Sequence, residues 1–98
     1  MKNLDRKAIL NYLRENKDVL EEQFGITKIA LFGSYARNEA HVDSDIDLLI
    51  ETKQQSFKNR MLLKEYLENH FHRKVDLCYF KSIRLFIKSH AEKDIVYA

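Results

Sequence analysis

Two aspartates stand at the start of an otherwise apolar segment, residues 45–51. Asp45 and Asp47 lie two residues apart, and because side chains alternate along a strand, both carboxylates are predicted to share one face while Ile46 lies on the other. Aspartate is disfavoured within strands, and like charges on one face repel each other unless a cation lies between them. Carboxylate oxygens are ligands that Mg²⁺ prefers. The pair therefore predicts a magnesium site.

A third aspartate, Asp76, interrupts the apolar segment 75–80 in the same way. The stretch between the two segments has helical character and is about twenty residues long, as a parallel crossover requires. Parallel neighbours begin at the same end of a sheet, so Asp76 is predicted to lie beside Asp45 and Asp47. These three carboxylates are the candidate catalytic and metal-binding residues.

A candidate phosphate-binding element follows the apolar segment 26–32. Gly33 permits a ligand to approach the backbone closely, and Ser34 opens a predicted helical turn whose free N–H groups can bind phosphate oxygens. Arg37, one turn later, adds a permanent positive charge. This element reaches the carboxylates only if strand 26–32 runs antiparallel to strand 45–51. A phosphate site facing a carboxylate metal site indicates metal-assisted phosphoryl or nucleotidyl transfer.

Other sites for nucleotides and metals are excluded by composition. The chain has 2 glycines, Gly25 and Gly33, whereas a Rossmann fingerprint needs three and a P-loop needs a Gly-Lys pair that is absent. A calcium loop beginning at Asp43 would need glycine and glutamate where Leu48 and Gln54 stand. Cys78 is the single cysteine, which excludes an intrachain disulfide and a cysteine zinc cage.

Charge and hydropathy limit the partners. There are 17 Lys and Arg against 15 Asp and Glu, a net charge of 17 − 15 = +2, so the chain is not a polybasic nucleic-acid binder and no direct nucleic-acid binding is expected. The longest uninterrupted apolar run, residues 29–32, is far too short to span a membrane, and the charged N-terminus lacks a signal-peptide core. We expect a cytoplasmic protein with no membrane contact and a single domain over residues 1–98.

The elements that must position these residues follow from hydrophobic spacing, which predicts an α/β (α+β) domain with a small mixed sheet and helices packed on it. The predicted order is a helical region over 4–24 with a candidate break at 16–18, strand 26–32, a helical turn from 33, strand 45–51, helix 52–73, strand 75–80, a helix from Ser82 and a short strand at 95–97. Gly25 suits the left-handed residue that ends a helix.

Helix 52–73 carries apolar residues at helical spacing, which predicts that they face the core: Phe57, Met61, Leu62, Tyr66, Leu67 and Phe71. The basic residues of the segment 53–74 are predicted to form a solvated face. The alternative is that they face an acidic partner or RNA.

The motifs resemble a known superfamily. Gly33-Ser34, ten intervening residues and Asp45-x-Asp47 match the signature of the DNA polymerase beta-like nucleotidyltransferases. The runs Gly-Ser-Tyr-Ala-Arg at 33–37 and Ser-Asp-Ile-Asp-Leu at 44–48 resemble its smallest branch, the minimal nucleotidyltransferases, which are about as long as this chain. Asn38 stands where that branch usually has glycine. Because asparagine tolerates left-handed geometry, the turn is expected to survive.

The resemblance implies roles for these residues. Gly33 and Ser34 would hold the triphosphate of ATP, with Arg37 and Ser44 as further nucleotide-binding residues. The three aspartates, Asp45, Asp47 and Asp76, would bind two Mg²⁺ ions.

The resemblance also implies an activity and a partner. Members of this size include MntA-like antitoxins, which transfer AMP from ATP to a tyrosine hydroxyl of a HEPN-type toxin. We therefore expect an Mg²⁺-dependent protein adenylyltransferase that acts as an antitoxin. Two alternatives stay open: a non-catalytic nucleotide-binding module that masks a toxin, and nucleotidyl transfer to a small-molecule or RNA acceptor.

Overall fold

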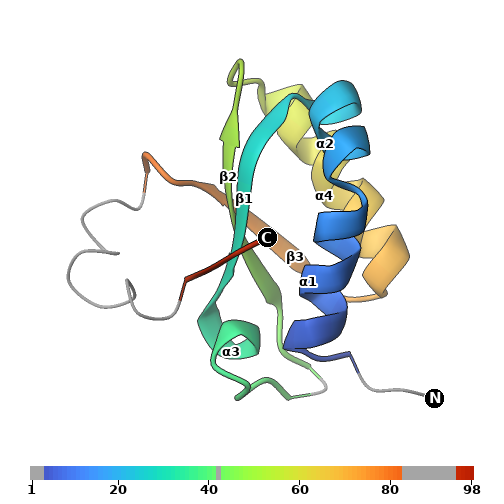
Figure 1. Ribbon diagram of the computed structural model, residues 1–98, viewed down its shortest axis with the longest axis vertical. Helices are drawn as coiled ribbons and strands as arrows, with labels where there is room; N and C mark the ends of the chain where they lie inside the picture. The colour runs from blue at the N-terminus through green and yellow to red at the C-terminus, as the bar shows by residue number, and fades with distance from the viewer. Residues whose placement is uncertain (1–3, 42, 83–94) are drawn as a thin grey trace.

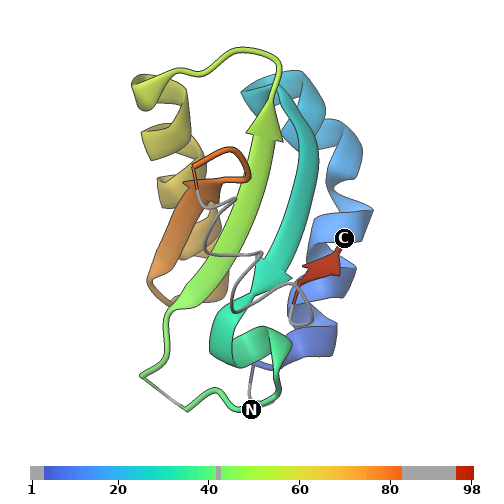
Figure 2. The same ribbon diagram turned by 90° about the vertical axis from the view of Figure 1, so that its left-hand side faces the viewer.

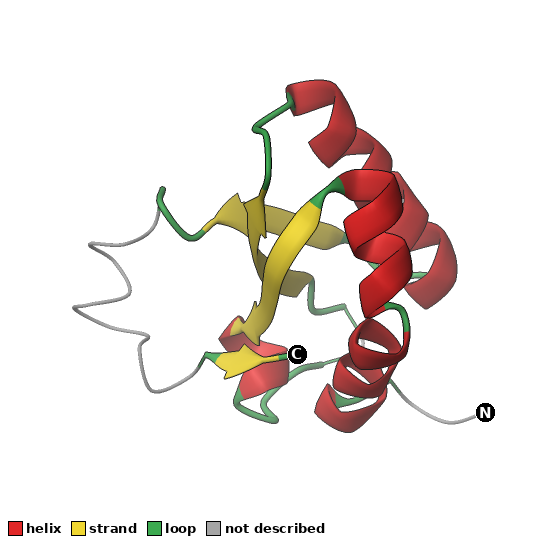
Figure 3. Ribbon diagram, turned by 45° about the horizontal axis from the view of Figure 1, so that its top comes forward, coloured by secondary structure: helices red, strands yellow, loops and turns green. Residues whose placement is uncertain are grey.

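The computed structural model describes residues 4–41, 43–82 and 95–98. Its centre is a four-stranded mixed sheet in the order β3-β2-β1-β4. Helices α1 (Arg6–Glu15), α2 (Lys17–Phe24) and α4 (Phe57–Phe71) cover one face of the sheet, while the short helix α3 (Gly33–Ala36) lies at the end of β1 (Figures 1 and 2). The other sheet face is turned away from the three longer helices (Figure 3), and the alternation of side chains along the strands places Asp47 and Asp76 on that face.

The strand directions confirm the predicted mixed sheet. Strand β1 (Ile26–Phe32) pairs antiparallel with β2 (Ile46–Thr52), which pairs parallel with β3 (Val75–Tyr79). Strand β4 (Val96–Tyr97) confirms the short strand predicted at 95–97, and the structure shows that it pairs antiparallel with β1. The crossover from β2 to β3 through α4 leaves β3 at one edge of the sheet.

The N-terminal helices begin and end where local chemistry directs. The Asp5 side chain caps α1 by accepting a hydrogen bond from Ala8 N at 2.8 Å. The predicted break lies at Asn16, between α1 and α2. Gly25 ends α2 with φ of 68°, which confirms the predicted left-handed cap.

The core lies between the sheet and these helices. Alternate residues of β2 point into it, and Ile46, Leu48 and Ile50 are almost fully buried. Leu13 of α1 and Leu67 of α4 are fully buried against them. Because Asp47 lies between Ile46 and Leu48, its side chain points to the opposite face, as the strand period predicts.

Helix α4 differs from its prediction in length and in the face that it buries. It begins at Phe57, capped by Ser56 Oγ, which accepts a hydrogen bond from Asn59 N at 3.2 Å. Its core residues are Leu63, Leu67 and Phe71. Three residues that were predicted to face the core are exposed instead, so the prediction is wrong for them. Phe57 is 71% exposed, Met61 44% and Leu62 48%.

The reason is geometric. The apolar residues of α4 cover two stripes of its surface, and only one stripe can lie against the sheet.

Two further predictions concern membrane spans and the helix after β3. None of the helices within the described ranges is long and apolar enough to cross a membrane. The helix predicted from Ser82 onward lies outside the described residues, except for Ser82 itself.

Candidate nucleotidyl-transfer site

The fold brings the three aspartates to one end of the sheet. Asp47 on β2 stands in register with Asp76 on the parallel strand β3, and Asp45 directly precedes β2. On the other side of β2, Asp47 is paired with Phe32, the last residue of β1. The phosphate-binding element begins at the next residue, Gly33, so the antiparallel pairing that the prediction required places that element against the carboxylates.

Gly33 packs directly on Asp47. It has φ of 77°, a conformation that residues with side chains rarely adopt. A Cβ at this position would collide with Asp47 Oδ2 and lie 3.2 Å from Asp47 Cγ. Glycine is therefore required here both by the backbone conformation and by the closeness of the carboxylate.

Helix α3 holds the rest of this turn in place. Tyr35 and Ala36 are buried and anchor it in the core. Asn38 follows with φ of 58°, which confirms that asparagine supplies the left-handed residue of the turn.

The cluster of negative charge shifts the protonation of Asp47. Burial, followed by the charges of Asp76 and Asp45, raises the pKa of Asp47 from 3.8 to about 6, and the Arg37 guanidinium opposes this shift. Asp47 is thus half-buried among carboxylates that disfavour its charge. A divalent cation at this point would favour the ionised form instead.

The three aspartate side chains do not form a complete metal-binding site in this structure. Among the residues that the structure describes, no three His, Cys, Asp or Glu side chains converge closely enough to hold a metal ion. The backbone register nevertheless places Asp47 and Asp76 side by side. Their carboxylates supply hard oxygen donors and a concentrated negative charge, which fits Mg²⁺ in chemistry. Metal binding would require these side chains to turn toward one ion.

Two other predicted nucleotide-binding residues have contacts of their own. Arg37 Nε donates to Glu39 Oε2 at 3.0 Å, while its charge also reaches Asp47. Ser44 Oγ accepts a hydrogen bond from His41 N at 2.7 Å and so stabilises the turn that precedes Asp45. The contact of Arg37 or Ser44 with a nucleotide stays a prediction.

Two arginines near the site were not identified from the sequence. Arg6 Nη1 donates to Ala36 O at 3.0 Å and ties α1 to the end of α3. Arg60 Nη1 donates to Leu77 O at 3.3 Å on β3, next to Asp76. Arg60 was predicted to lie on a solvated face, yet it is half-buried. No local pattern could have revealed either contact, because each joins elements far apart in the chain.

Cys78 lies two residues after Asp76 and is half-buried. Burial and the charges of Asp76 and Asp47 raise the pKa of its thiol, although Arg60 opposes them. A raised pKa lowers the thiolate fraction, which agrees with a structural cysteine.

Comparison with known proteins decides the family. Residues 13–98 match the sequence profile described as the nucleotidyltransferase domain. The chain belongs to this family. It is therefore an enzyme of the nucleotidyltransferase class, and the resemblance drawn from the glycine-serine and aspartate motifs is confirmed.

The relatives span almost the whole chain. The protein adenylyltransferase MntA of Thermococcus cleftensis is 36% identical over 98 residues, which are 99% of each chain. A Methanocaldococcus jannaschii protein, whose name assigns it by inference to the protein adenylyltransferases, is 41% identical over 93 residues. The match covers 91% of this chain and 93% of that protein.

Solved structures agree with the fold. A structure described as a minimal nucleotidyltransferase superposes with a TM-score of 0.75 at 26% identity and covers 98% of both chains. A toxin–antitoxin structure with AMP-PNP matches with a TM-score of 0.57 at 29% identity, over 81% of this chain and 60% of that chain. The predicted α/β fold is thereby confirmed.

Proposed function

We propose that this protein is an Mg²⁺-dependent protein adenylyltransferase that transfers AMP from ATP to a tyrosine hydroxyl of a HEPN-type toxin and so acts as an antitoxin. The observation that carries the proposal is the in-register pair Asp47 and Asp76 at one end of the sheet, with Gly33 packed against Asp47. The similarity to MntA of Thermococcus cleftensis supports protein adenylylation, and the similarity to the toxin–antitoxin structure with AMP-PNP supports a toxin partner and ATP. Since ATP is the substrate, we place the enzyme in the cytoplasm.

The residues divide the reaction between them. The tyrosine oxygen attacks the α-phosphorus of ATP, the new P–O bond forms, and the bond to the departing pyrophosphate breaks. Gly33 and Ser34 hold the triphosphate, while Asp76 accepts the proton of the tyrosine hydroxyl. Two Mg²⁺ ions, one on all three aspartates and one on Asp45 and Asp47, would lower the pKa of the hydroxyl and neutralise the pyrophosphate.

The charge cluster favours catalysis over the alternative that the protein only masks a toxin. An ionised Asp47 destabilises the protein at neutral pH, because burial and its neighbours raise its pKa to about 6. A module that only masks a toxin gains nothing from such a residue, whereas an active site commonly retains groups that lower stability. Transfer to a small molecule or RNA would use the same carboxylates, so only the acceptor separates it from the proposal.

The test is a transfer assay with labelled ATP, Mg²⁺ and a co-expressed HEPN-type toxin as the candidate acceptor. The expected result is label in the toxin and an AMP-sized mass increment, both lost when the toxin tyrosine is replaced by phenylalanine. Asp47→Asn serves as the inactive control, and Glu22→Gln on α2 serves as an exposed carboxylate control. Label in RNA or a small molecule, with none in the toxin, would support the second alternative. Toxin inhibition by Asp47→Asn as strong as by the parent would support masking.

A further inference from the structure

Helix α4 presents an apolar surface that the core does not use. Phe57, Met61 and Leu62 line a hollow of about 510 Å³ on its outer side. They are three of the four large apolar residues exposed in the described part of the chain. An exposed apolar hollow of this kind is typical of a site that binds another molecule.

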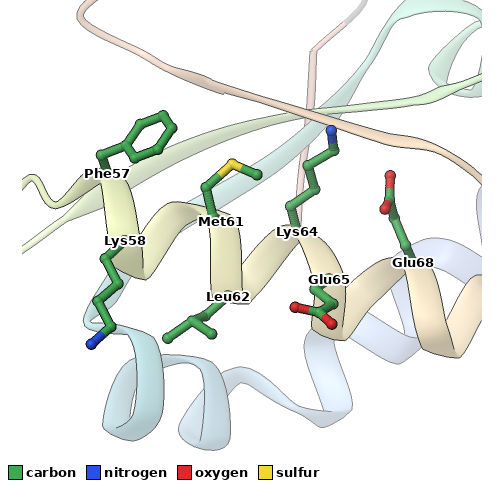
Figure 4. Close-up of a pocket in the computed structure, with 7 residues that line it drawn as sticks. All are labelled: Phe57, Lys58, Met61, Leu62, Lys64, Glu65 and Glu68. Atoms are coloured by element: carbon green, nitrogen blue, oxygen red, sulfur yellow. The ribbon is translucent and has the colours of Figure 1, made fainter.

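This hollow continues to the proposed active site. A second hollow of about 140 Å³ shares Met61 and Lys64 with the first and is also lined by Arg60 and Asp76. Figure 4 shows Phe57, Met61, Lys64 and Glu68 on the side of α4 that faces β3, with Lys58, Leu62 and Glu65 projecting from the opposite side. A molecule bound along the first hollow would thus reach the strand that carries Asp76.

The layout of the site fixes the direction from which an acceptor must approach. Across the sheet, the order is Gly33 after β1, Asp47 on β2 and Asp76 on β3. Since the triphosphate is assigned to Gly33, the acceptor is left with the side of Asp76. Strand β3 is the edge of the sheet, and α4 is the described element that flanks it there.

The same edge determines the kind of contact. Arg60 Nη1 donates to Leu77 O, and Glu68 Oε2 accepts from Val75 N at 2.9 Å. These side chains occupy backbone groups of β3 that an added strand would need. A partner is therefore expected to bind through side chains, as an amphipathic helix in an apolar groove does.

Charge identifies a further feature of the partner. Lys64 is half-buried beside Asp76 and forms no ion pair with any residue in the described ranges. Arg60 stands next to it, its guanidinium 5.6 Å from the Phe57 ring centre and 5.7 Å from that of Tyr79. An acidic side chain of the partner would pair with Lys64 at this point.

We propose, on the basis of the function proposed above, that this face of α4 is where the acceptor protein docks. An amphipathic helix of the toxin packs on Phe57 and Met61, on the side of α4 that faces β3, and an acidic residue near the acceptor tyrosine contacts Lys64. This docking places the tyrosine hydroxyl beside Asp76. The α4 docking face is thus the part of the protein that selects the acceptor, while the aspartates and Gly33 act on ATP.

The test separates docking from chemistry. Lys64→Glu and Met61→Glu should each raise the KM for the toxin by at least about tenfold, because each places a charge against an acidic or an apolar part of the partner. The affinity for ATP-Mg²⁺ and the melting temperature should stay close to those of the parent. Lys64→Arg should retain most of the parent's behaviour, and Lys17→Glu on α2, the same change at an exposed site, should leave the KM unaltered.

Binding of the toxin without ATP, measured by interferometry, keeps the two proposals distinct. If the parent transfers AMP and both α4 variants do so with the parent's KM, the docking face is wrong and the proposed function stands. If the parent binds the toxin through α4 but transfers no AMP, the proposed function fails and the docking face stands. If the parent forms a dimer that Met61→Glu dissolves without raising the KM, a second copy covers this face and the docking proposal is overturned.

Discussion

Replacing Asp47 by asparagine should make the metal-free protein more stable at neutral pH while it abolishes transfer. Asparagine has nearly the same volume, keeps hydrogen-bonding capacity and carries no charge. The folded protein raises the pKa of Asp47 to about 6, against 3.8 for the free residue, so folding disfavours the ionised form. The variant removes that unfavourable charge.

The sign and size follow from this shift. A raised pKa means that the stability is fully present below about pH 3.8 and is lost as the pH rises through about 6. A shift of about two units corresponds to about 3 kcal/mol, and because Asp47 is only half-buried, solvent and salt reduce this to about 1–1.5 kcal/mol. For a domain of this size we expect Asp47→Asn to melt about 4–10 °C higher at pH 7.5. At pH 4 the difference should be close to zero.

The assay is thermal unfolding in EDTA and low salt, from pH 4 to pH 8, with Glu22→Gln as the control for loss of one exposed carboxylate. Added Mg²⁺ should stabilise the parent and leave the variant nearly unchanged, since the variant lacks a ligand. The reasoning is refuted if Asp47→Asn melts below the parent at pH 7.5, or if its gain is the same at pH 4 and pH 8.

Three further outcomes follow from the site. Mg²⁺ with ATP should raise the melting temperature of the parent, by about 2.7 kcal/mol of stability at a hundredfold excess over Kd; indifference to both would contradict the metal assignment. Gly33→Ala should lower stability by about 1–2 kcal/mol through the positive φ alone, and should also weaken ATP binding because its Cβ displaces Asp47; unchanged calorimetric affinity would show that the phosphate turn lies elsewhere. Asp76→Asn should abolish transfer yet keep ATP-Mg²⁺ affinity within about tenfold, or roughly 1.4 kcal/mol, whereas Asp45→Asn should weaken both; equal losses of affinity in the two variants would disprove the division of roles.

Much of this protein could be predicted from local signals. The period of two along residues 45–51 predicted that Asp47 and Ile46 point to opposite faces, and the length of the crossover predicted Asp76 beside Asp47, as the parallel register shows. Gly33 was predicted to let a ligand approach the backbone; the structure places Asp47 against it, and the approach of a phosphate stays a prediction. Such features depend on backbone geometry and residue type, which neighbouring residues in the chain already define.

Only the tertiary structure decided which side chains make contacts between elements that are distant in the sequence. Spacing assigned Phe57, Met61 and Leu62 to the core, but only the packing of α4 on the sheet selected Leu63, Leu67 and Phe71 for that role.

The sequence likewise could not predict the contacts of Arg6 and Arg60 or the raised pKa of Asp47. Arg60 reaches Leu77 across 17 positions, and Arg6 reaches Ala36 across 30. The pKa of Asp47 depends on burial and on charges from neighbouring strands. Interaction energies of this kind vary with distance and solvent exposure, which a linear sequence does not contain until the chain has folded.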